Sequence, residues 1–191
     1  IYEFFLKIIS MKKKLYTVIG LMSGTSMDGV DLSIISSDGY DHFVNISDEY
    51  YEYNNKLQKE LIELRDLVTT TKDLLKNSDK LRELERNLTL FHADIVNKKL
   101  KQIKDKIDLV GFHGQTIFHN SKEKISKQLG DGKLLSQITK KKVVYDFRQE
   151  DIKNNGQGAP LTPIFHYTLS KKIKEEHNFE FPLGFLNIGG I

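Results

Sequence analysis

Apolar and polar positions alternate between Tyr16 and Ser36, which predicts two strands joined by a turn. An apolar run, Val18 to Met22, enters the glycine-containing turn 23–29. The chain then leaves through a segment that places Val30, Leu32 and Ile34 on one face and Asp31 and Ser33 on the other. The pattern predicts a β-hairpin with one face in the protein core.

The middle of the chain has a helical pattern. All 13 glycines lie outside the range 40–110, which favours long helices there. Two sets of apolar residues recur at helical spacing: Leu57, Leu61, Leu64, Leu67 and Val68, then Leu81, Leu84, Leu88, Phe91, Ile95 and Leu100. Residues 77–79 predict a break between them, with Ser78 or Asp79 as the N-cap. We interpret both stripes as core packing.

Beyond Lys106 the pattern changes to short strands separated by loops. We expect strands at 107–112, 125–129 and 143–145 and a short helix at 134–139. A loop at 154–161 precedes a helix at 163–174 that carries Pro163 in its first turn. A hairpin followed by helices and returning strands predicts an α/β lobe with a mixed β-sheet and flanking helices.

Composition narrows the class of protein. The 191 residues suffice for one domain or one lobe of a larger protein, and the hydrophobic fraction of 39% is typical of a chain with a real core. The absence of cysteine excludes disulfides and cysteine-based zinc sites and agrees with a cytoplasmic location. No segment approaches the ~20 apolar residues of a membrane span, so we expect no membrane partner.

The charge pattern does not favour nucleic-acid binding. The 29 basic and 26 acidic residues nearly cancel, leaving a formal net charge of +3. Lysine runs occur at 12–14 and 140–142, but no aromatic residues interleave with them as a nucleic-acid platform requires. We interpret these runs as solvated faces and expect no nucleic-acid partner.

The turn between the first two strands has the composition of a phosphate-binding loop. Its glycines allow close backbone approach, consecutive N–H groups can form an anion-binding nest, and hydroxyls add donors. Its acidic residues suit a phosphate that arrives with Mg²⁺. The candidate residues are Gly24, Thr25, Ser26, Met27, Asp28, Gly29, Val30 and Asp31. An ordinary polar hairpin turn has the same spacing, so the pattern alone leaves both interpretations open.

Two further polar clusters follow predicted strands, where open α/β sheets bind ligands. The first is 113–116, whose imidazole, amide and hydroxyl could bind a polyhydroxylated ligand or serve as structural partners. The second is 146–151 with 156–161, in which Asp146 could organise hydroxyls and Arg148 could bind a carboxylate or phosphate. Alternatively, Asp146, Arg148 and Asp151 form a salt-bridge network that shapes the loop. The two common glycine-rich nucleotide signatures are absent, so a nucleotide would be bound by hairpin turns.

Five motifs in order give the chain a specific resemblance. They are GLMSGTSMDGVD at 20–31, GFHGQT at 111–116, VVYDFR at 143–148, GQGAPL at 156–161 and LNIGG at 186–190. Together they resemble the anhydro-N-acetylmuramic acid kinase family, from about Leu15 to the end of the chain. The resemblance implies the actin-like, sugar-kinase ATPase fold with two α/β lobes. Residues 1–14 would be an irregular extension, 15–182 the N-terminal lobe and 183–191 the first strand of a truncated second lobe.

The resemblance also implies a reaction. ATP, with Mg²⁺, and water convert 1,6-anhydro-N-acetylmuramic acid to N-acetylmuramic acid 6-phosphate during peptidoglycan recycling. It assigns 24–31 to the first phosphate loop and Gly189 and Gly190 to the second. The sugar side would comprise His113, Gln115, Asp146, Arg148 and Gln157. The family's general base lies in an Asp-x-Gly-Pro-Gly-Asn motif beyond Ile191, so we assign no catalytic residue and no direct metal ligand within the chain.

Other interpretations remain. A non-catalytic sugar- or nucleotide-binding remnant of an interrupted kinase gene would carry the same motifs. A different carbohydrate kinase fits the HGQT and GQGAPL motifs less well. Residues 130–135 depart from the Gly-Asn-Pro-type sequence of the family, which leaves that loop uncertain. The resemblance also leaves a homodimer open.

Overall fold

A five-stranded mixed sheet forms the centre of the computed structural model, which describes residues 14–186. Its strand order is β3-β2-β1-β4-β7, with β1 and β2 antiparallel, β2 and β3 antiparallel, and β1, β4 and β7 parallel. The strands are β1 (Tyr16–Met22), β2 (Gly29–Ser37), β3 (Phe43–Glu52), β4 (Leu109–Phe112) and β7 (Lys142–Tyr145). This arrangement confirms the predicted α/β class and mixed sheet.

The β1–β2 pair is the predicted hairpin. Ile19 pairs with Ile34 and Leu21 with Leu32, and all four side chains are buried. Asp31 points to the opposite face and is exposed. The alternation of apolar and polar residues therefore predicted correctly which face of the hairpin enters the core.

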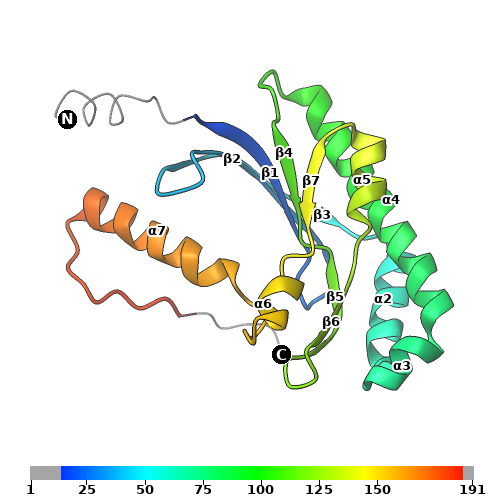
Figure 1. The fold of residues 1–191 in the computed structure, drawn as a ribbon. Coiled ribbons are helices and arrows are strands. Elements are labelled where there is room, and N and C mark those ends of the chain that lie inside the picture. Colours follow the sequence, from blue (N-terminus) through cyan, green and yellow to red (C-terminus); the bar gives the residue numbers. More distant parts are fainter. Residues whose placement is uncertain (1–13, 187–191) are drawn as a thin grey trace, which may run out of the picture.

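Helices cover that apolar face (Figure 1). They are α2 (Asn55–Leu67), α4 (Ser78–Gln102) and α5 (Gly132–Thr139), and the leucines of the two predicted stripes supply much of their buried surface. The predicted break lies between α3 (Thr71–Lys76) and α4, but the N-cap of α4 is Asn77 rather than Ser78 or Asp79. The side-chain amide of Asn77 donates instead to the Asp73 carbonyl at 2.9 Å, which ties the two helices together.

The other face of the sheet is only partly covered. Helix α7 (Leu161–His177) lies on that side, preceded by the short α6 (Gln149–Lys153) (Figure 1). Phe165 of α7 packs against Phe43 of β3 with ring centroids 5.4 Å apart. Pro163 stands in the first turn of α7 as predicted. Because few side chains of α7 are buried, an open space remains between its N-terminal end and the sheet.

A second sheet pairs β5 (Gln115–Asn120) with β6 (Ile125–Leu129) in antiparallel orientation. Strand β6 was predicted, whereas β3, β5, α3 and α6 were not. Strand β3 is an edge strand, and its apolar residues Val44 and Ile46 are exposed, so the apolar positions do not mark its more buried face. The start of β5 was interpreted only as a ligand-binding cluster.

The predicted domain boundaries remain predictions. Residues 183–186 form neither helix nor strand, and the rest of the predicted strand at 183–191, including Gly189 and Gly190, lies outside the described residues. Residues 1–13 of the predicted extension also lie outside them. Within residues 14–186, no helix combines the length and apolar character that a membrane crossing requires.

We expect Gly29→Ala to destabilise the chain because β3 passes directly over this glycine. An added Cβ would lie 2.4 Å from the Tyr51 carbonyl oxygen and 2.6 Å from the Tyr50 hydroxyl oxygen. Such overpacking lowers the free energy of unfolding by about 2 kcal/mol, which urea titration would measure. Gly20→Ala on β1 is the matched control, since its nearest neighbour would be 3.9 Å away. Equal stability of the two variants would contradict the close approach.

Candidate functional site

The segments after β1, β4 and β7 meet at one edge of the sheet. Parallel strands have their carboxyl ends at the same edge, and this is where the predicted motifs begin. The His113 N–H donates to the Leu21 carbonyl at 3.1 Å, which extends the β1–β4 pairing past the end of the strand. The predicted gathering of polar motifs at strand ends is therefore present in the structure.

The loop between β1 and β2, Ser23–Asp28, is compact and anchored. The Met27 N–H donates to the Gly24 carbonyl at 3.3 Å, and Met27 takes a left-handed backbone conformation with φ of 56°. This conformation turns the Met27 side chain into the core, where it is buried. Thr25, Ser26 and Asp28 remain exposed. The loop therefore presents its polar residues to solvent while one apolar side chain holds it down.

Asp28 carries a carboxylate at the end of this loop. The Ser26 hydroxyl donates to its Oδ1 at 2.6 Å. This hydrogen bond is the main cause that lowers the pKa of Asp28 below its ordinary value, because it favours the charged form. Asp28 is therefore ionised at neutral pH and can attract a cation.

A buried hydrogen-bonded network lies beneath the loop. The Ser23 hydroxyl is 2.7 Å from the Tyr53 hydroxyl and 3.3 Å from His92 Nε2. His92 Nδ1 lies 2.8 Å from the Leu88 carbonyl oxygen, which can only accept, so Nδ1 carries the proton and Nε2 is the acceptor. Burial lowers the pKa of His92 to about 4, which keeps the imidazole neutral. Ser23 therefore donates to His92, and Tyr53 donates to Ser23.

Gln115 also supports the loop. Its side chain is fully buried, and its Nε2 donates to the Gly24 carbonyl at 2.9 Å. Its Oε1 has no partner among the described residues. Gln115 does not line the cleft described below. The structure thus places this predicted sugar-side residue beneath the phosphate-loop candidate.

His113 and Arg148 join the motifs that follow β4 and β7. Arg148 Nη2 lies 3.0 Å from His113 Nε2, and since a guanidinium only donates, Nε2 is the acceptor. His113 Nδ1 then donates to the Gly114 carbonyl at 2.8 Å. Burial lowers the pKa of His113, so the ring is neutral with both nitrogens engaged. His113 is thus a hydrogen-bond partner that orients Arg148.

Arg148 has no acidic partner among the described residues. Its Nη1 donates to the Gly158 carbonyl at 2.7 Å, while its buried Nε has no acceptor there. Burial lowers the pKa of Arg148, but a guanidinium stays charged in proteins. Burying a cation without an anion is costly. The arrangement is that of a positive group open to an anionic ligand.

A cleft of about 620 Å³ lies in front of Arg148, between the sheet and the start of α7. Gly20 of β1 and Gly111 of β4 are register partners and form part of its floor. Neither glycine has a close neighbour where a Cβ would lie, so the missing side chains leave the sheet face bare. The cleft is lined mainly by Gly20, Met22, Asp31, Ser33, Gly111, His113, Phe147, Arg148 and residues 158–162.

Asp146 and Gln157 lie outside this cleft. Asp146 lines a separate pocket of about 260 Å³ beyond His113, and burial raises the pKa of its carboxyl. Gln157 is exposed. The suggested salt-bridge network of Asp146, Arg148 and Asp151 is wrong within the described residues, since no ion pair joins them. Asp151 and Arg148 instead each bind Gly158, at its N–H and its carbonyl respectively.

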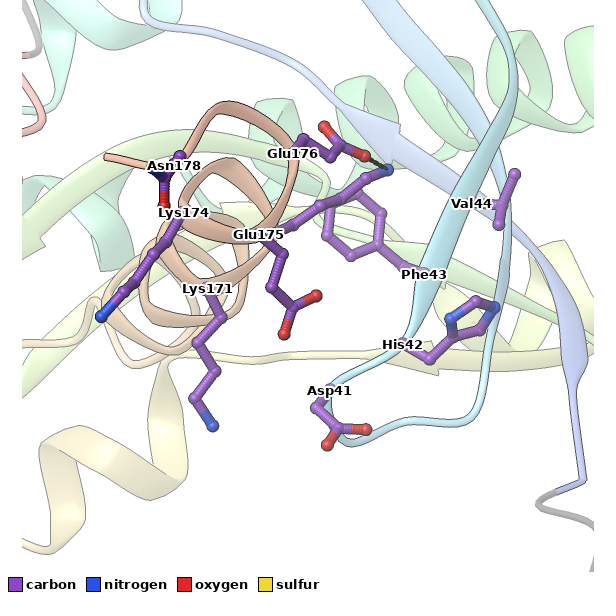
Figure 2. A pocket seen from close by; sticks show the side chains of 10 residues that line it. Asp41, His42, Phe43, Val44, Lys171, Lys174, Glu175, Glu176 and Asn178 are labelled. Carbon is purple, nitrogen blue, oxygen red and sulfur yellow. Dashed lines mark ion pairs between the residues drawn. The ribbon is translucent and has the colours of Figure 1, made fainter. Parts of the chain in front are cut away.

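A larger groove, about 930 Å³, lies elsewhere (Figure 2). It separates the β2–β3 turn from the C-terminal half of α7, and none of the motif residues line it. Its charged groups are of both signs, and Lys172 and Glu176 pair across 3.8 Å. The amine of Lys172 also lies 4.8 Å from the Phe43 ring centroid. We therefore place the candidate site at the smaller cleft, where the motifs converge.

The mixed five-stranded sheet flanked by helices, with the motif loops at its carboxyl edge, is that of a sugar-kinase ATPase fold. A family model described as anhydro-N-acetylmuramic acid kinase matches residues 16–191, and the chain belongs to that family. Similar proteins with that name include those of Pelagibacter ubique (strain HTCC1062), 56% identical over 179 residues, and Agrobacterium fabrum (strain C58), 42% identical over 185. These matches cover 94% and 92% of this chain. The chain spans about half the length of these curated relatives, 47% of each.

The predicted family and fold class are thus confirmed. Sequence reasoning missed the support beneath the loop, namely Ser23, Tyr53 and His92. One signal was available, since His92 falls four residues after Leu88 on the apolar stripe of α4. A polar residue at a core position needs a partner, but the stripe does not indicate which residue supplies it.

We expect His92 to make the chain less stable as pH falls below neutral. The ordinary histidine pKa of 6.5 applies when the chain is unfolded, whereas the folded value is about 4. The unfolded state therefore takes up a proton first, and up to about 3 kcal/mol of stability is lost between these values. Urea unfolding at pH 7 and pH 5 should show a smaller loss for His92→Gln than for the original chain. The variant keeps part of the pH dependence of its stability, because the pKa of His113 is lowered too. An unchanged slope would contradict a neutral, buried His92.

Proposed function

We propose that this chain is the N-terminal lobe of an ATP-dependent kinase that converts 1,6-anhydro-N-acetylmuramic acid and water to N-acetylmuramic acid 6-phosphate. The observation that carries the proposal is the position of Arg148, a half-buried cation without an acidic partner in the described residues, in a cleft beside the loop Ser23–Asp28. Family membership and the named relatives support the reaction. Peptidoglycan recycling in the cytoplasm is the proposed setting.

The loop is proposed to bind the phosphates of ATP. Within residues 14–186, the backbone N–H groups of Gly24, Thr25 and Ser26 donate to no protein acceptor. Together with the hydroxyl of Thr25, they form a set of donors on one exposed turn. In the complete protein, Gly189 and Gly190 are proposed to open the second phosphate loop. Both lie outside the described residues.

Mg²⁺ is proposed to arrive with the nucleotide. The described residues contain no group of three histidine or acidic side chains that could hold a metal alone. Asp28 and Asp31 are exposed carboxylates at the loop and the adjoining strand, which fits an ion that is also bound by phosphate oxygens. When bound, the ion would neutralise phosphate charge during transfer. The protein's part is to hold an ionised Asp28 beside the loop.

Arg148 is proposed to recognise the carboxylate of the sugar. The proposed substrate is an acid, so its carboxylate would supply the anionic partner that Arg148 lacks among the described residues. A guanidinium presents a fork of donors, and Gly158 and His113 each engage one N–H of its two Nη atoms, which leaves a second N–H on each Nη for a ligand. Charge recognition at this point would distinguish the acid from a neutral anhydro sugar. Asp146 and Gln157 remain proposed sugar-side residues that act from outside the cleft.

The proposed chemistry is mainly positioning. In phosphoryl transfer, alignment and charge neutralisation account for most of the catalysis. Both nitrogens of His113 are engaged, so it is not a candidate general base. We propose that the base that activates water comes from the family's Asp-x-Gly-Pro-Gly-Asn motif, which lies beyond Ile191. This lobe would bind phosphate and sugar while the second lobe supplies the base.

Homodimer formation also remains a proposal. Apolar side chains of α7 and the segment after it are exposed, including Ile164, Tyr167, Phe181 and Leu186. A surface of this kind is usually covered by another part of a protein or by a second copy.

We expect Asp28→Ala to weaken ATP use in the complete product of the gene. Removal of the carboxylate leaves the proposed Mg²⁺ site with less charge, so kcat/KM for Mg·ATP should fall at least about tenfold. A coupled assay of ADP formation, with the anhydro sugar present or omitted, measures this. Asp48→Ala on the edge strand β3 is the control. Full activity of Asp28→Ala would overturn the loop assignment, and binding without turnover by the unmodified protein would favour the remnant interpretation.

We expect Arg148→Lys to lose discrimination between acidic and neutral sugars. The variant keeps the charge but lacks the forked donors, so kcat/KM for anhydro-N-acetylmuramic acid should fall about tenfold or more. Anhydro-N-acetylglucosamine, which lacks the carboxylate, serves as the matched substrate and should lose little. Competition between the two sugars measures the ratio directly. An equal loss of kcat/KM for both sugars would show that Arg148 shapes the loop and does not bind the carboxylate.

A further inference from the structure

Tyr53 stands at an unusual position relative to the loop Ser23–Asp28. It lies between the end of β3 and the start of α2, and its side chain is almost fully buried. Its hydroxyl is 2.7 Å from the hydroxyl of Ser23, the first residue of the loop. Its backbone N–H donates to the carbonyl of Asp28, the last residue, at 2.8 Å. One residue therefore contacts both ends of the loop.

We propose that Tyr53 is a positioning residue for nucleotide binding, which holds the two ends of the loop Ser23–Asp28 at a fixed separation. The inference rests on the proposed function, in which this loop binds phosphate. With its ends held, the exposed N–H groups of the loop are ordered before the ligand arrives. Less conformational entropy is then lost when the ligand binds.

The hydrogen bonds of this network run in one direction. The Leu88 carbonyl requires a proton on His92 Nδ1, so His92 Nε2 accepts the Ser23 proton. The Ser23 oxygen is then free to accept from Tyr53. Each hydroxyl has a single orientation, and the loop is tied through Ser23 to α4. A network with only one proton arrangement fixes geometry better than one whose hydroxyls can rotate.

The tyrosine ring is held independently of its hydroxyl. It packs edge-on against Phe91 of α4 with centroids 5.1 Å apart, and it lies 6.5 Å from the His92 ring. Tyr53→Phe therefore removes one hydroxyl and keeps the packing. The chain offers a matched control in Tyr51→Phe, since the Tyr51 hydroxyl bonds Glu49 of the same strand and does not reach the loop.

The test uses the complete product of the gene and two measurements. Amide hydrogen exchange should become about fivefold faster at Met27, whose N–H donates to the Gly24 carbonyl, in Tyr53→Phe. Exchange in α4 and the melting temperature should match those of Tyr51→Phe. Calorimetry with Mg·ADP should show affinity weakened about fivefold. The KM for ATP should rise in proportion, and the KM for the sugar should stay within about twofold. A general loss of structure would instead move both KM values.

A second variant tests whether Tyr53 acts through Ser23. Ser23→Ala should reproduce the faster loop exchange, and adding Tyr53→Phe to it should change little, because the two hydroxyls act as a pair. Additive effects of the two changes, or a Tyr53→Phe protein that equals Tyr51→Phe, would overturn the inference. If the unmodified protein binds no Mg·ADP but loop exchange still responds, the positioning role stands and the nucleotide assignment of the proposed function is wrong.

Discussion

The site depends on the parallel pairing of β1 with β4. The two strands run in register from Val18 opposite Leu109 to Leu21 opposite Phe112. This pairing brings together segments that are far apart in the chain, so that Gln115 reaches the carbonyl of Gly24 across 91 residues. Strand β7 then adds beside β4 and brings Arg148 to His113. Without the β1–β4 pairing, the loop, the imidazole and the guanidinium would have no common edge.

The fold could be predicted well where local pattern and burial agree. The β1–β2 hairpin and the long helix α4 each bury one regular stripe, so periodicity identified them. Edge strand β3 and the short helices α3 and α6 bury little and lack such a stripe. Helix α3 has a local signal, since the Thr70 N–H donates to the Asp73 carboxylate at 2.8 Å, but this capping pattern is too short to assign alone.

The sequence predicts which residues belong to the candidate site, but not how they are arranged in space. Motif composition selected Asp28, His113, Gln115 and Arg148, and the structure places all four near one edge. Their arrangement follows from tertiary contacts. The Gln115 side chain points into the interior because β5 begins at this residue. Asp146 lies on the far side of His113 because its backbone takes a φ of 60° after β7. Residue types indicate which chemistry is available, whereas strand pairing decides which groups share a cleft.

Met27 belongs to the loop by sequence and to the core by position. Its side chain is 1% exposed although Thr25, Ser26 and Asp28 around it face solvent. The residues that pack around this thioether therefore share responsibility for the shape of the loop. A change of side-chain volume in the core beneath Met27 would also move the loop above it. The interior of this part of the chain thus determines the shape of an exposed polar surface as well as stability.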